Sequence, residues 1–197
     1  MSQDHERIRI GIDIGGTITK IAAVNDSGGV QRLKTLPTSG EHGLEAYLAA
    51  LFETVNSFPE LRQSAGIGIA VAGFVDATRS SMFYNPNLPC LEGRPLRRQF
   101  QDRFDIPVEL EADSNAACLA EFVYGAGRGS RRFLCIAVGT GVGGGMIVDG
   151  EIVRLAHGGL GDIGHVIVEP GGPPCGSGCH GHSFCGDFLG IEMAAVG

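Results

Sequence analysis

The sequence contains no run of apolar residues long enough to cross a bilayer, and residues 1–7 are too polar for a signal peptide. We therefore expect a cytoplasmic protein with no membrane partner. Basic residues are also few: 15 Lys and Arg stand against 22 Asp and Glu, giving a net charge of −7. This acidic balance argues against nucleic acid as a principal partner. The 43% hydrophobic and 19% charged residues are ordinary for a globular chain that buries a core.

Residues 8–24 lack the spacing of two common nucleotide-binding motifs, G-x-G-x-x-G and G-K-[ST]. They contain two β-branched runs separated by a glycine corner at Gly15 and Gly16, which predicts a tight strand–turn–strand hairpin whose glycines can adopt positive φ. Such a corner exposes backbone N–H groups to an anion. Asp13 places a carboxylate at its mouth, where a Mg²⁺ ion with its waters would bind.

A second glycine-rich segment, residues 139–145, lies between strands predicted at 133–138 and 146–148. Alone it could be a flexible loop, but paired with the first hairpin it suggests a nucleotide held from both sides. Between the two segments we predict strands at 30–36, 66–72 and 108–111, helices at 44–58, 96–104 and 116–123, and a loop-like region at 74–96. Ser114 or Asn115 is the expected N-cap of the helix at 116–123.

Four motifs in order resemble those of the bacterial ROK family of sugar kinases, within the actin/hexokinase/Hsp70 ATPase superfamily. They are residues 13–17 with Lys20, residues 87–89 with 95–96, residues 139–145, and residues 161–165. In that order they resemble the first phosphate motif, the sugar loop, the second phosphate motif and the Gly-Glu-x-Gly-His signature. The resemblance covers nearly the whole chain. It implies an α/β, actin-like ATPase (ribonuclease H-like) fold with two domains around a cleft, at residues 1–111 and 112–197, the second apparently truncated.

The resemblance also implies ATP-dependent phosphorylation of a hexose hydroxyl, with Mg²⁺ bound and Asp113 as general base. Asp113 lies where a strand ends and a helix begins, so that its side chain can point into a cleft; the alternative is a helix-capping Asp. The residues implied in phosphate binding are Asp13, Gly15, Gly16, Thr17, Lys20, Gly139, Thr140, Gly141 and Gly143. Those implied in sugar binding are Asn87, Asp162, His165 and Asp187.

Two departures from the family pattern bear on the substrate. The family usually has Asn, contacting the sugar, at the position of Ala112, and Glu at the position of Asp162. Recognition of a hydroxyl depends on each polar group finding its partner. A cyclitol or an amino sugar is therefore an alternative to glucose.

The segment after residue 164 is rich in Cys and His, a composition that suits tetrahedral Zn²⁺. The family binds a structural zinc with one His and three Cys, and a gapped alignment assigns these ligands to His165, Cys175, Cys179 and Cys185. An ungapped alignment instead places Ser177 at the second Cys position and His182 at the last. A Cys/His-rich loop without metal is the third possibility.

The family pattern continues beyond residue 197, so we expect either a fragment or a natively shortened protein that is a poor kinase alone and pairs with a second copy. Two other functions are weighed. A ROK transcriptional regulator would carry a helix-turn-helix domain ahead of Asp13, where only twelve residues stand. A sugar-binding remnant with weak activity would be consistent with Ala112.

Overall fold

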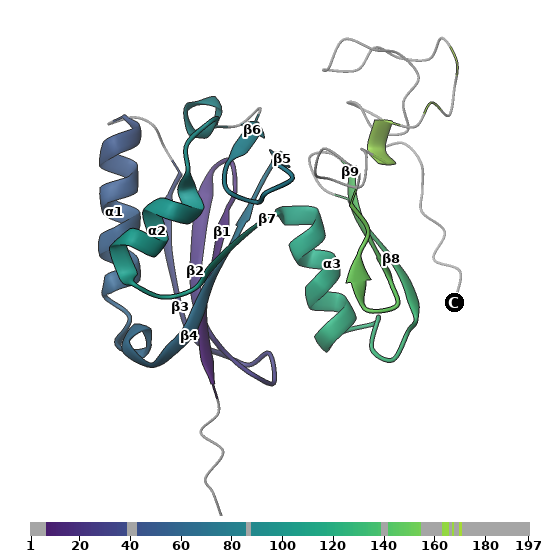
Figure 1. Ribbon diagram of the computed structural model, residues 1–197, viewed down its shortest axis with the longest axis horizontal. Helices are drawn as coiled ribbons and strands as arrows, with labels where there is room; N and C mark the ends of the chain where they lie inside the picture. The colour runs from purple at the N-terminus through teal and green to yellow at the C-terminus, as the bar shows by residue number, and fades with distance from the viewer. Residues whose placement is uncertain are drawn as a thin grey trace, which may run out of the picture.

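A computed structural model describes residues 7–38, 43–85, 88–138, 142–154, 163–165, 167 and 170 (Figure 1). Its largest sheet has the strand order β3-β2-β1-β4-β7. These strands are β1 (Ile8–Ile14), β2 (Ile18–Asn25), β3 (Val30–Pro37), β4 (Ser64–Val71) and β7 (Val108–Ala112). The first three are joined antiparallel, whereas β1, β4 and β7 run parallel. All five strands lie close to where the alternating apolar residues predict them.

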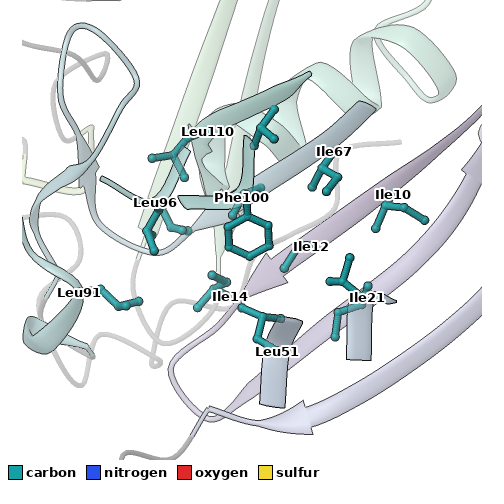
Figure 2. Packing of buried hydrophobic residues seen from close by; sticks show 14 of the residues in the cluster. Ile10, Ile12, Ile14, Ile21, Leu51, Ile67, Leu91, Leu96, Phe100 and Leu110 are labelled. Atoms are coloured by element: carbon teal, nitrogen blue, oxygen red, sulfur yellow. The ribbon is translucent and has the colours of Figure 1, made fainter. Parts of the chain in front are cut away.

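One face of this sheet carries the main core. Ile10, Ile12 and Ile14 alternate along β1 and are at most 2% exposed. Helices α1 (Leu44–Asn56) and α2 (Leu96–Phe104) cover them (Figure 1). Figure 2 shows side chains of both helices and of the strands meeting in this layer. Burying each such side chain contributes about 1.5–3 kcal/mol, so this face supplies much of the stability.

The chain that follows β7 forms a second layer. Helix α3 (Asp113–Tyr124) follows β7 directly and packs against a three-stranded sheet of order β10-β9-β8 (Figure 1). Those strands are β8 (Arg132–Val138), β9 (Val142–Val148) and β10 (Glu151–Ile152). A smaller apolar cluster around Cys118 and Ile147 joins them. None of the helices in the described part of the chain has the length and apolar character of a membrane span.

The loop-like region predicted at 74–96 is partly wrong, because it holds the hairpin β5 (Phe74–Val75) and β6 (Met82–Tyr84). A short 3-10 helix, η3 (Pro89–Leu91), follows; others are η2 (Pro59–Gln63) and η4 (Ile163–His165). Gly73 enters the hairpin with a φ of 105°, and a Cβ there would collide with the Tyr84 carbonyl oxygen. Only glycine fits that turn without strain.

The predicted N-cap is also wrong. Helix α3 begins at Asp113, its N-cap is Ala112, and no side chain of the N-cap residue bonds to the first turn. At the first hairpin, Gly15 does not need positive φ. A Cβ there would instead lie 3.0 Å from the Ile18 carbonyl oxygen, so close backbone approach favours glycine.

Candidate active site

Asp13 and Asp113, about a hundred residues apart in the chain, lie at the same edge of the large sheet. Ile14 pairs with Val71 and Val71 with Ala112, so the carboxyl ends of β1, β4 and β7 are level. Asp13 precedes Ile14 and Asp113 follows Ala112. One strand separates β1 from β7, which places these backbones roughly 10 Å apart. The topology thus brings both predicted acids to one edge.

The negative charge of Asp13 also acts on the carboxyl group of Asp113. Asp113 is exposed, yet partial desolvation by the surrounding protein raises the pKa of its carboxyl group, and the negative charge of Asp13 adds to this rise. A hydrogen bond that the Ser114 N–H donates to Asp113 Oδ1, at 2.7 Å, acts in the opposite direction. A solvent-accessible carboxylate with a raised pKa has the properties of a general base.

The first hairpin presents a carboxylate and an ammonium group side by side. Asp13 and Lys20 are Cα partners across β1 and β2, and Lys20 Nζ lies 3.8 Å from Asp13 Oδ2. Both side chains are about half exposed, at 49% and 59%. Asp13 therefore keeps oxygen positions that could hold a hydrated Mg²⁺ ion, since this ion binds few protein carboxylates directly. Gly16 and Thr17 of the turn are exposed as well.

A buried hydroxyl cluster, Thr19, Thr38 and Tyr47, lies beneath this hairpin. Thr19 Oγ1 is 2.7 Å from both Thr38 Oγ1 and the Tyr47 hydroxyl, and all three residues are at most 6% exposed. Burial raises the pKa of Tyr47 to about 12. The Thr38 N–H bonds to the Thr17 carbonyl oxygen at 2.9 Å, which ties the cluster to the turn. In the sequence, the one signal of this cluster is Thr19 at an inward position of β2.

The second glycine segment is partly strand rather than loop. Gly143, Gly144 and Gly145 lie within β9. A Cβ at Gly143 would lie 3.1 Å from Ser114 Cβ, and one at Gly145 would lie 2.6 Å from a Cβ of α3. These glycines thus let β9 approach α3 closely, which brings Gly143 beside the residue that follows Asp113. Gly139, Thr140 and Gly141 lie outside the described residues.

The polypeptide on both sides of Asn87 is held by Asn85, which sequence reasoning missed. Asn85 is 1% exposed, its Oδ1 accepts the Leu88 N–H at 2.8 Å, and its own N–H bonds to Glu92 Oε1 at 2.8 Å. Asn87 itself lies outside the described residues. The sequence signal for this role is an Asn two residues before Asn87, because Asn side chains commonly bond to the backbone a few residues further along the chain.

Most of the remaining predicted sugar and zinc residues lie outside the described part of the chain. They are Asp162, Cys175, Cys179, Cys185 and Asp187. The backbone of His165 ends η4, but its side chain is not described. Ala112 is described: it is 8% exposed within the main core and offers no polar group to a substrate.

Comparison with known proteins places this geometry in a family. The model of the ROK family matches residues 9–193. The glucokinase of Streptomyces coelicolor is 33% identical over 174 residues, which cover 88% of this chain and 54% of that protein. The xylose repressor of Bacillus subtilis is 31% identical over 132 residues, covering 66% of this chain and 33% of that protein.

A solved structure agrees. The crystal structure of a ROK family glucokinase from Streptomyces griseus, in complex with glucose and AMPPNP, matches with a TM-score of 0.76 at 33% identity. The match covers 89% of this chain and 55% of that one, so the chain spans about half the length of such relatives. The predicted actin-like ATPase fold is confirmed by this likeness. The chain belongs to the ROK family.

Proposed function

We propose that this chain carries the phosphoryl-transfer site of an ATP-dependent kinase that acts on a hydroxyl of a glucose-like hexose. The observation that carries the proposal is the position of Asp13 and Asp113 at one sheet edge, close enough for the charge of Asp13 to raise the pKa of Asp113. The glucokinases among the relatives support the same activity.

Each group has a separate task in this proposal. Asp113 accepts the proton of the sugar hydroxyl as that oxygen attacks the terminal phosphorus of ATP and ADP leaves. Its raised pKa makes it a stronger base than an ordinary aspartate. Lys20 and the backbone N–H groups of the Gly15–Thr17 turn face the negative charge of the phosphates. Asp13 would hold Mg²⁺ through its waters, and the ion would supply positive charge to the phosphates.

We further propose that the two domains divide near residue 111 and close around the substrates. Closure would exclude water, so that the sugar hydroxyl receives the phosphoryl group. Gly139–Gly141 and Gly143 would contact phosphate from the second domain, and Asn87, Asp162, His165 and Asp187 would contact the sugar. His165 with Cys175, Cys179 and Cys185 would hold a structural Zn²⁺. A cytoplasmic homodimer is the proposed form.

A second candidate function is that of a sugar-binding protein with weak activity, which is separate from the alternative of a cyclitol or amino-sugar kinase. Ala112 favours it, because this buried methyl group stands where the family usually has a sugar-contacting Asn. The match to a repressor also shows that relatives of this chain are not all enzymes.

The test is phosphorylation of a panel of hexoses, amino sugars and cyclitols with Mg-ATP, comparing the parent chain with Asp113→Asn. We expect a sugar phosphate to form only with the parent, because Asn cannot accept the proton. The exposed Asp102→Asn on α2 is the matched control and should keep parental turnover. Sugar binding detected by calorimetry, without turnover that depends on Asp113, would favour the second candidate.

A further inference from the structure

Glu111 lies two residues before Asp113 and receives three hydrogen-bond donors from three parts of the structure. Its Oε1 accepts the N–H of Ala112 at 3.1 Å and the side-chain amide of Asn115 at 3.0 Å. Its Oε2 pairs with Arg154, which follows β10 in the second layer. The Glu111 side chain is only 13% exposed. One carboxylate thus joins β7, the first turn of α3 and the end of β10.

These contacts support the start of α3. Ala112 has no side chain that can bond to the first turn, so the start of α3 depends on other contacts. Glu111 supplies a negative charge next to that helix N-terminus, where the macrodipole favours it. It also holds the side chain of Asn115 within the first turn.

Asp113 needs such support because it has few contacts of its own. The hydrogen bonds described for its side chain are local, from the neighbouring Ser114 N–H and from its own backbone N–H. Its position relative to Asp13 is therefore set by the backbone where β7 passes into α3. Glu111 is fixed at that junction.

Arg154 and Asn115 in turn fix Glu111. Asn115 is 2% exposed and its side-chain amide N–H donates to Glu111, whereas its Oδ1 has no hydrogen-bond partner among the described residues. Arg154 Nη1 also reaches the Ile152 carbonyl oxygen at 3.5 Å, which anchors the guanidinium on β10. The positive charge of Arg154 offsets the negative charge of Glu111. Glu111 is level with Asp13 in the sheet, because Ala70 of β4 is the Cα partner of both.

We propose that Glu111 is a positioning residue for Asp113, and that Arg154 transmits the placement of the second layer to it. The inference rests on the proposed function, because the task of Asp113 is that of the base. Arg154→Met breaks the ion pair while keeping an unbranched side chain. Misplacing a catalytic group by about 1 Å can cost roughly 100-fold in rate, so we expect kcat to fall between about 10- and 100-fold. KM for ATP and sugar should change less than about threefold, since Glu111 is not expected to touch either.

Conservative and matched variants separate positioning from general destabilisation. Arg154→Lys keeps the charge and should restore part of kcat, whereas Glu111→Gln should resemble Arg154→Met. Arg131→Met is the control, because Arg131 pairs with Asp149 on the exposed side of the second sheet. It should leave kcat unchanged.

A second readout does not depend on turnover. Backbone amide NMR of the 20.6 kDa chain should show exchange broadening at residues 113–115 in Arg154→Met, with residues 10–14 of β1 unchanged. Parental kcat and unchanged amide signals in Arg154→Met would overturn the inference, even if the melting temperature falls. Full turnover by Asp113→Asn would instead overturn the proposed function, so the two failures are distinguishable.

Discussion

Replacing Tyr47 with Phe removes one hydroxyl from the buried cluster beneath the first hairpin. The Tyr47 hydroxyl lies 2.7 Å from Thr19 Oγ1, and Thr19 is fully buried, so water cannot replace the lost partner. A neutral hydrogen bond contributes about 0.5–1.5 kcal/mol, and a buried group that loses its partner costs about 1–3 kcal/mol. Thr19 keeps Thr38 as a partner. We therefore expect Tyr47→Phe to lower the free energy of unfolding by about 1–2 kcal/mol near neutral pH.

The same substitution should change the response to alkali. Burial raises the pKa of Tyr47 from its usual 10.0 to about 12. Between these values the unfolded chain loses the phenolic proton while the folded chain keeps it. The stability linked to this proton is fully present below pH 10 and is lost as pH rises from 10 to about 12. At about 1.36 kcal/mol per pKa unit, this loss of stability is on the order of 2–3 kcal/mol. The Phe variant has no ionisable hydroxyl at this position and should not show the loss.

The measurement is urea unfolding of the parent and Tyr47→Phe chains near neutral pH and again near pH 11. The variant should be less stable at neutral pH, and the difference should shrink or reverse in alkali. Tyr84→Phe is the matched control because the Tyr84 side chain is 48% exposed. If Tyr47→Phe and Tyr84→Phe behaved alike at both pH values, the buried cluster would not support the hairpin as argued.

Three further predictions follow from the site and its surroundings. The carboxyl group of Asp113 should titrate at higher pH than an ordinary aspartate, because its pKa is raised, and turnover should be lost as pH falls through that pKa. In Asp13→Asn the neighbouring negative charge is absent, so a carbon-13 NMR titration should show a lower pKa for Asp113 than in the parent. Gly73→Ala should destabilise the chain by about 2 kcal/mol or more in thermal unfolding, because its φ is positive and its Cβ would meet backbone. Gly68→Ala, with no atom within 4 Å of its added Cβ, should be tolerated. Ala112→Asn restores the residue that the family usually has at this position, and a smaller KM for hexose would support the proposed substrate.

Strands and helices with a regular apolar period could be predicted from the sequence. β1 alternates inward Ile with outward Gly and Asp, and α1 repeats apolar residues at helical spacing, so both lie close to their predicted bounds. The hairpin of β5 and β6 could not be predicted in this way. Its strands have two and three residues, too few to show a period, and it forms because Gly73 fits against distant backbone.

The glycines of β9 illustrate a second limit. A run such as Gly143–Gly145 can form a loop that contacts phosphate or a strand that approaches another element closely, and the two have the same sequence signal. Gly145 is an example of the second case, since an added Cβ there would meet α3. The same limit applies to Glu111. Its neighbour Arg154 is 43 residues away, and no local pattern links them.

The distance between Asp13 and Asp113 depends on the strand order of the sheet, which the sequence around either acid does not indicate. Each lies at the end of an apolar strand, which the sequence indicates, but their separation follows from the insertion of β4 between β1 and β7. On this face β4 carries Gly68 and Ala70, and Ala70 is the Cα partner of both Asp13 and Glu111. Ala70 has only a methyl group, so β4 adds no long side chain between the strand ends that carry Asp13 and Asp113. The candidate site therefore depends as much on what β4 lacks as on the two acids beside it.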